Sequence, residues 1–151
     1  MQASTKNVSK LTKLNIGRCV IMLGFAMGLI SLFATIGHIG NPDYLLVITS
    51  EEGQAHGWYH VLREVCGDIM TMVVILMLLF GKPQNRTPFT WLLSLLLMLG
   101  YYAPFWIGTP FLGQLSAPNI GAEIVHIVMA VLALGGLAIV RSEFAEITND
   151  V

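Results

Sequence analysis

The sequence predicts an all-α fold: an integral membrane bundle of four helices, with both termini cytoplasmic and two long outer loops. Composition is the first reason. Apolar residues make up 55% of the 151 positions, charged residues 11%, and mean hydropathy is +0.72. Soluble domains carry about a quarter charged residues. This composition therefore favours a membrane protein, and we expect residues 1–151 to form a single domain.

Apolar stretches are the second reason, and they predict helices at 17–39, 57–80, 88–107 and 120–141. A crossing helix needs about 20 mostly apolar residues. The uncharged run 69–80 is too short, because twelve residues rise only about 18 Å against a hydrocarbon core of about 30 Å. The second helix must therefore begin near Gly57 and carry charged residues into the membrane.

The basic residues are the third reason, and they predict the orientation. Seven of the eight fall before or at the start of the first helix, between the second and third, or after the fourth. The connections 40–56 and 108–119 contain no Lys or Arg. By the positive-inside rule, the basic side is cytoplasmic and these two loops face outward. The predicted location is a bacterial inner membrane.

The segment "HGWYHVLREVCGD" at 56–68 is the main functional signal. At 100° per residue, its charged and histidine side chains occupy an arc of about 140°. They are His56, His60, Arg63, Glu64 and Asp68. Trp58, Leu62, Val65 and Ile69 fall on the opposite side, which we expect to face lipid. Ionisable residues inside a membrane mark functional sites by default, although small bundles also use polar networks to fix helix packing.

Other segments place polar groups at the same depth. The first helix ends with His38, and the fourth opens with Glu123 and His126 at i, i+3 spacing, which puts them on one face. The third ends with Tyr101, Tyr102 and Trp106, a pattern typical of an aromatic belt at the membrane surface. We therefore expect a polar pocket in the outer half of the bundle.

The charges in this pocket predict a cation. Glu64, Asp68 and Glu123 contribute −3 and Arg63 returns +1, and a net charge of −2 away from water needs protons or a divalent ion to neutralise it. Imidazole and carboxylate together suit zinc, iron or manganese. The predicted metal ligands are His60, Glu64, Glu123 and His126. A haem between His60 and His126 is the less favoured cofactor.

The remaining polar residues receive supporting roles in this hypothesis. Glu64, Asp68 and Arg63 are the candidate catalytic and proton-handling residues. His38 and Tyr102 would close the pocket as cofactor-binding residues. The reaction would be redox or hydrolytic.

A second hypothesis remains open beside the metal site. In it the chain is a non-catalytic membrane subunit or a small-ligand binder, and the polar cluster is a helix-packing network. Either way its surroundings would be membrane lipid, with assembly into a homo-oligomer or a larger membrane complex. Nucleic acid is not an expected partner, because no basic face is interleaved with aromatic residues.

The two cysteines do not predict redox chemistry. Cys19 and Cys66 lie at different depths in the predicted helices, too far apart for a disulfide, whose Cα atoms are within about 7 Å. We expect both to be small buried apolar residues.

Overall fold

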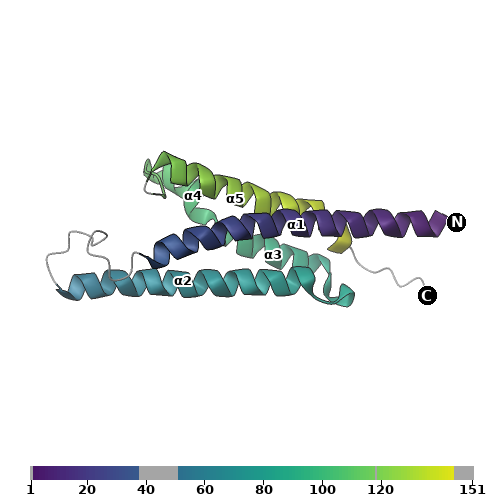
Figure 1. Cartoon of the computed structure of the whole chain (residues 1–151), viewed down its shortest axis with the longest axis horizontal. Coiled ribbons are helices and arrows are strands. Elements are labelled where there is room, and N and C mark those ends of the chain that lie inside the picture. The colour runs from purple at the N-terminus through teal and green to yellow at the C-terminus, as the bar shows by residue number, and fades with distance from the viewer. Residues whose placement is uncertain (1, 38–50, 118, 145–151) are drawn as a thin grey trace.

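The computed structural model describes residues 2–37, 51–117 and 119–144, with side chains from residue 12 and, in the second helix, from residue 59 (Figure 1). These residues form helices and turns without strands, which confirms the all-α class. The elements are α1 (Gln2–Ile36), α2 (Glu51–Phe80), η2 (Pro83–Asn85), α3 (Pro88–Tyr101), α4 (Ala103–Ile107), η3 (Gly108–Leu112), α5 (Ile120–Ile139) and η4 (Arg141–Phe144).

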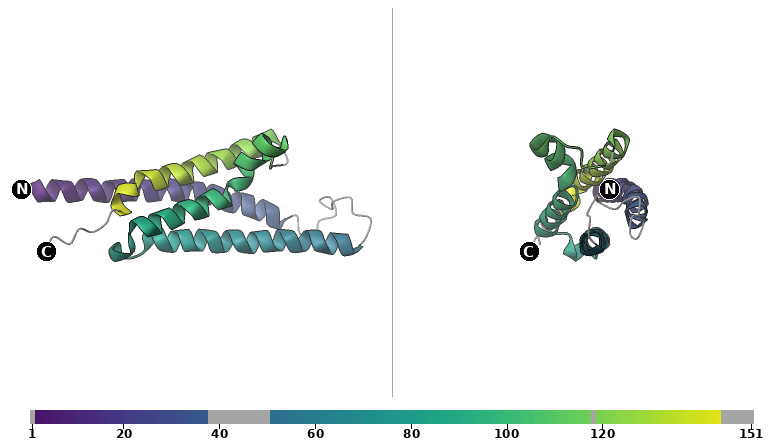
Figure 2. Two further views of the ribbon diagram at one scale, coloured as in Figure 1. Left: turned by 180° about the vertical axis from the view of Figure 1, so that it is seen from behind. Right: turned by 90° about the vertical axis from the view of Figure 1, so that its left-hand side faces the viewer.

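Successive long helices run in opposite directions (Figures 1 and 2). The most extensive packing is between α1 and α5; α2 packs against α1 and α3, and α3 also packs against α5. Between their described residues, α2 and α5 share no comparable interface and lie diagonally across the bundle. These two helices diverge toward the end where α1 finishes (Figure 1).

Glycines bring α1 and α5 together. A Cβ added at Gly17 would lie 2.7 Å from the Gly136 carbonyl oxygen, and one added at Gly24 would lie 3.0 Å from the Met129 carbonyl oxygen. Only residues without side chains allow this approach, a common arrangement between membrane helices. The α1–α5 pair is therefore the tightly packed half of the bundle.

Local capping explains where α3 and α5 begin. The Thr87 hydroxyl accepts from the Thr90 amide at 3.2 Å, and the Thr90 hydroxyl accepts from the Thr87 amide at 2.9 Å. Asn119 Oδ1 accepts from the Ala122 amide at 2.9 Å at the start of α5. Each contact satisfies a backbone N–H that has no partner within the helix.

Three helix boundaries differ from those predicted. α1 begins at Gln2 rather than near 17, and α2 begins at Glu51 rather than near 57. The predicted helix 88–107 is broken at Tyr102, between α3 and α4. Pro104 explains the break. It has no N–H to donate to a carbonyl in the preceding turn, and it disfavours helical geometry at the residue before it.

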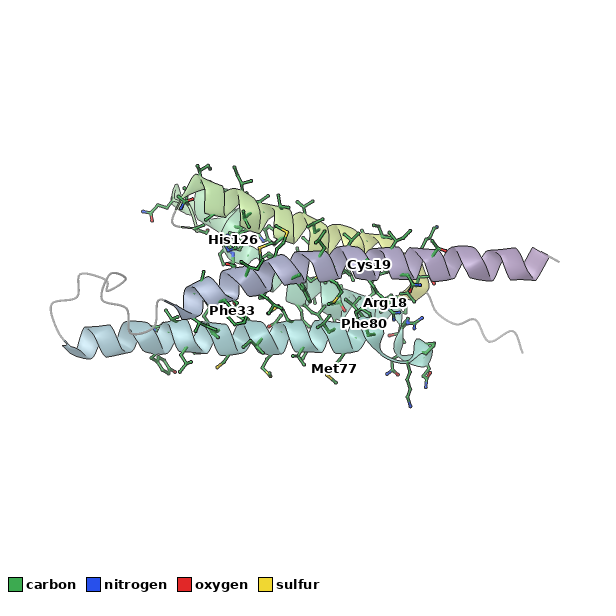
Figure 3. All side chains as sticks on the ribbon, viewed as in Figure 1. Arg18, Cys19, Phe33, Met77, Phe80 and His126 are labelled. Atoms are coloured by element: carbon green, nitrogen blue, oxygen red, sulfur yellow. The ribbon has the colours of Figure 1, made fainter. Side chains whose placement is uncertain are left out.

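Four basic residues lie toward the end of the bundle where α2 and α5 finish and α3 begins, here called the basic end: Arg18, Lys82, Arg86 and Arg141. The Arg18 guanidinium donates to the Leu79 carbonyl at 3.0 and 2.5 Å and lies 4.7 Å from the centre of the Phe80 ring (Figure 3). It thereby caps the C-terminal end of α2 from α1. This grouping follows from the alternating helix directions.

Among the residues that the structure describes, two segments are long and apolar enough to cross a membrane, Thr12–Ile36 and Ile120–Ile139. α3 is apolar but has only 14 residues. The outer surface is also rich in large apolar side chains. Ile30 is 73% exposed, Phe33 72% and Val131 64%, and Met77 points away from the bundle in Figure 3.

The cysteine prediction was wrong in one respect. Cys19 and Cys66 are both exposed rather than buried, and both are free thiols. Each lies on the outer side of its helix, so neither belongs to the core.

Candidate functional site

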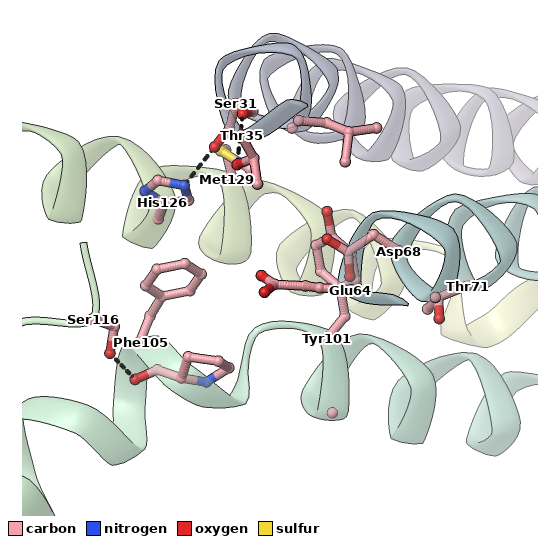
Figure 4. Close-up of a pocket in the computed structure, with 15 residues that line it drawn as sticks. Ser31, Thr35, Glu64, Asp68, Thr71, Tyr101, Phe105, Ser116, His126 and Met129 are labelled. Atoms are coloured by element: carbon pink, nitrogen blue, oxygen red, sulfur yellow. Dashed lines mark hydrogen bonds between the residues drawn. The ribbon is translucent and has the colours of Figure 1, made fainter. Parts of the chain in front are cut away.

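A cavity of about 550 Å³ lies among α1, α2, α3, α4 and α5, on the side of the bundle away from the basic end (Figure 4). It occupies the space left where α2 and α5 diverge. Its lining is Gly28, Ser31, Leu32, Thr35, Glu64, Gly67, Asp68, Thr71, Gly100, Tyr101, Pro104, Phe105, Ser116, His126 and Met129. Polar groups from five segments therefore meet around one space.

Helix α2 contributes the charged wall. Glu64 and Asp68 are one helical turn apart, so they share a face, and Figure 4 places both beside Tyr101. Thr71 continues this face toward the basic end. A Cβ added at Gly67 would meet nothing within 4 Å, so this glycine opens onto free space rather than helping two helices approach.

Helices α1 and α5 contribute a hydrogen-bonded wall. Ser31 Oγ lies 2.7 Å from His126 Nε2, and His126 Nδ1 lies 2.6 Å from the Ala122 carbonyl oxygen. Because a carbonyl can only accept, Nδ1 carries the proton, and in the neutral ring Nε2 accepts from the serine hydroxyl. The tautomer of His126 is thus set by its own helix.

Aromatic and loop groups form the rest of the enclosure. The Phe105 ring stacks on the His126 ring, with centroids 4.5 Å apart and an interplanar angle of 18°. The Ser116 hydroxyl donates to the Pro104 carbonyl, which ties the segment after η3 to α4. Phe105 and Ser116 therefore hold the end of the cavity farthest from the basic end.

The structure does not bring the four predicted metal ligands together. Only Glu64 and His126 line the cavity, and in the described part of the chain no three His, Cys, Asp or Glu side chains form a group that could hold a metal ion. His60 is exposed, with its ring 5.6 Å from that of Tyr59. The physical reason is rotation: His60 lies near the middle of the polar arc, and the buried face of α2 is turned about 105° away from it, so His60 points outward.

Glu123 departs from the prediction in a different way. It is 3% exposed, and its Oε2 accepts from the Ala117 amide at 2.8 Å, while Oε1 is buried without a hydrogen-bond partner. Its side chain holds the segment that precedes α5 instead of lining the cavity. At i, i+3 spacing it points about 60° away from His126, which is enough to separate their roles.

Two further predicted site residues lie away from the cavity, and a third cannot be placed. The Arg63 guanidinium lies 5.8 Å from the centre of the Tyr59 ring, outside the cavity lining. Tyr102 is 1% exposed and belongs to the core, so it is neither a lining residue nor part of a surface aromatic belt. Its neighbour Tyr101 lines the cavity instead. His38 lies outside the described residues.

Several lining residues were not predicted. Ser31 and Thr35 are four apart in an otherwise apolar helix, and Thr71 follows Asp68 at i+3. Hydroxyls at helical spacing within an apolar run were the available signal, because they mark one face. Phe105 had no such signal, since its position depends on the break between α3 and α4.

The lining has a definite charge pattern. Glu64 and Asp68 are its acidic members, and it includes no Lys or Arg. Hydroxyl groups, one imidazole and the rings of Tyr101 and Phe105 complete it. Such a set can neutralise a positive charge and pack against an apolar body.

Comparisons with known proteins add no assignment to this geometry: no family model matches the chain, and no curated protein and no solved structure matches it either.

Proposed function

We propose that this chain is a four-span protein of a bacterial inner membrane that binds a small molecule in the cavity between its helices. The observation that carries the proposal is the cavity itself. Its volume of about 550 Å³ falls within the roughly 300–1,000 Å³ of small-molecule sites, and its mixed lining resembles theirs. This favours the small-ligand binder over a metal-dependent enzyme.

Surface and charge support the membrane part of the proposal. Contiguous exposed apolar side chains of this extent are rare on soluble monomers. α3 and α4 together cover residues 88–107, about the length of one crossing. α2 crosses as well, because Glu64 and Asp68 face the cavity rather than lipid.

Orientation follows from the basic end. Lys and Arg concentrate on the cytoplasmic side of membrane proteins. With Arg18, Lys82, Arg86 and Arg141 inside, the cavity lies in the outer half of the membrane. Its ligand would then enter from the extracytoplasmic side.

A metal centre has weaker support. The predicted site required His60 and Glu123 beside Glu64 and His126, and those two side chains lie elsewhere. Zinc, iron and manganese sites in proteins use at least three protein ligands in most cases. Glu64, Asp68 and the neighbouring hydroxyl groups would offer a metal ion oxygen ligands only, without the imidazole ligands of the predicted site.

One observation favours a second candidate, the packing network. The Ser31–His126 contact joins α1 to α5 directly, as expected of a polar group that fixes helix packing. In this case His126 would act structurally even if the cavity binds a ligand. The two roles are separable, because Glu64 and Asp68 take no part in that hydrogen bond.

Filling the cavity tests the proposal. Gly28→Leu places an isobutyl group inside the lining, because a Cβ added at Gly28 would already lie 3.2 Å from Met129 Cε and 3.8 Å from Tyr101 Oη, which both belong to the lining. Gly135→Leu makes the same change at a glycine on α5 that lies outside the lining. Purified protein in detergent would be screened by thermal shift against cationic, neutral and anionic small molecules. We expect hits with wild type and Gly135→Leu that vanish in Gly28→Leu. Absence of saturable binding by all three classes would count against the proposal.

A further inference from the structure

We infer that the ligand of this cavity is an organic ammonium ion, an amine attached to an aromatic or alkyl body. This inference rests on the proposed function and names its ligand class. It combines three independent features of the lining: charge, volume and aromatic surface. The acidic pair alone would not mark a site, but it lines a partly open cavity that also has an apolar wall.

Charge comes first. Glu64 and Asp68 place two carboxylates on one face of α2, and the lining holds no Lys or Arg to balance them. Arg63, next to Glu64 in sequence, lies over Tyr59 outside the lining. Glu64 is exposed and Asp68 is half-buried, so the cost of this pair comes from two like charges one helical turn apart, and a bound cation relieves that cost. An anionic ligand would add to it.

Volume separates an organic cation from a metal ion. A space of about 550 Å³ is many times the roughly 30 Å³ that one water molecule occupies in the liquid, so a bare ion would leave most of it to water. Three lining residues, Gly28, Gly67 and Gly100, have no side chain to occupy this volume. A body of several carbon atoms fits there.

Aromatic and apolar groups supply the contact for that body. Phe105, Tyr101, Leu32 and Met129 all line the cavity. An ammonium group is attracted to the face of an aromatic ring within about 6 Å, and more strongly where water is excluded. The hydroxyl oxygens of Thr35 and Thr71 can accept hydrogen bonds from the other N–H groups of the ammonium ion. The lining thus matches each part of an organic ammonium ion.

Three probes of nearly equal size test the charge requirement: 2-phenylethylamine, 2-phenylethanol and phenylacetate. They share a phenyl ring and carry a positive, neutral or negative head group. Binding to the full-length protein in detergent would be measured by isothermal titration. We expect saturable binding of the amine, at least tenfold weaker binding of the alcohol, and no binding of phenylacetate.

Variants locate the amine. Glu64→Gln and Asp68→Asn should each weaken amine binding about tenfold or more, since charge-assisted hydrogen bonds are roughly twice as strong as neutral ones. Glu143→Gln, the same acid-to-amide change in η4 at the basic end, should leave it unchanged. Gly28→Leu and Thr35→Phe, which enlarge two lining positions on α1, should abolish it by filling the space. Having two carboxylate variants and two cavity variants keeps the test valid if one of them does not fold.

Other outcomes overturn the inference, and they differ from failure of the proposed function. If 2-phenylethanol or phenylacetate binds as well as the amine and Gly28→Leu removes that binding, the cavity is a ligand site but not for ammonium ions. If Zn²⁺ or Ca²⁺ binds in a Glu64-dependent way while the amine does not, the ligand is a metal ion. Amine binding that persists in Gly28→Leu and Thr35→Phe lies outside the cavity. If no probe binds at all, the proposed function fails too.

Discussion

The hydroxyl of Ser31 on α1 and Nε2 of His126 on α5 lie 2.7 Å apart, and this contact forms one wall of the cavity. The backbone carbonyl of Ala122 fixes the histidine tautomer, so the serine is the donor. The wall therefore depends on a hydrogen bond between the two most extensively packed helices.

We expect Ser31→Ala to lower the free energy of unfolding by about 1 kcal/mol, because it leaves the imidazole nitrogen without its donor. The measurement is equilibrium unfolding in mixed micelles. Ser142→Ala, which removes the hydroxyl of an exposed serine at the basic end, is the control and should change little. Equal stability of Ser31→Ala and wild type would show that the contact does not hold α1 and α5 together.

Two neighbouring glycines on α5 should respond in opposite ways to the same change. A Cβ at Gly136 would lie 2.7 Å from the Gly17 carbonyl oxygen and 2.6 Å from Ile21 Cγ1, whereas one at Gly135 would meet nothing within 4 Å. Gly136→Ala should therefore destabilise by about 1–3 kcal/mol through overpacking. Gly135→Ala should be neutral or stabilise by up to about 1 kcal/mol, since alanine is the better helix former. The measurement is thermal unfolding of both variants. A similar loss of stability in Gly135→Ala and Gly136→Ala would contradict the close α1–α5 packing.

A matched pair of methionines tests the rotation of α2. Met72 is 5% exposed and Met70 is 57% exposed. Met72→Ala should cost about 2 kcal/mol or more, as large-to-small changes in a packed core do, and Met70→Ala much less. Comparable unfolding midpoints for the two variants would mean that α2 turns another face to the bundle.

Glu123 should control the order of the segment before α5. Its carboxylate accepts from the Ala117 amide at 2.8 Å, and hydrogen bonds to charged groups are worth about 1.5–3 kcal/mol. We expect Glu123→Ala to speed hydrogen exchange at the Ala117 amide tenfold or more. Glu123→Gln keeps an acceptor oxygen, so its exchange rate at the Ala117 amide should fall between those of wild type and Glu123→Ala. An unchanged exchange rate at the Ala117 amide in Glu123→Ala would show that Glu123 does not order the segment before α5.

The four-span topology predicts opposite accessibility for two positions. In a Cys19→Ser, Cys66→Ser background, Gly53→Cys should react with an impermeant thiol reagent from outside intact cells. Lys82→Cys should react only after the cells are opened. Labelling of both from outside would overturn the orientation and, with it, an outward-facing cavity.

Much of the architecture could be predicted along the chain, because it depends on order and periodicity alone. Apolar runs located the helical segments, and alternating basic connections predicted that Arg18, Lys82, Arg86 and Arg141 would share one end. The last helix was predicted to begin at residue 120, and α5 begins there, capped by Asn119. These properties need no knowledge of which helices touch.

The rotation of α2 was decided only by packing. Taking His60 as zero, the polar arc centres near about 10°, whereas the buried side chains of α2 centre near about 105°. The buried set is Val65, Met72, Ile75 and Leu79. Glu64 and Asp68, at about 40° and 80°, therefore face inward, while His60 and Arg63 turn away. Val65, expected on the lipid side, is 5% exposed for the same reason.

The membership of the cavity also required the tertiary structure. The order of residues was enough to predict that polar groups concentrate in one half of the bundle, because depth along a helix follows from residue count. Only packing decided which of them meet: the glycines of α1 and α5 draw those helices together, α2 lies diagonally opposite α5, and the break at Tyr102 turns Phe105 toward His126. Periodicity sets the angles between residues on one helix, but the direction each helix faces depends on contacts between segments distant in sequence.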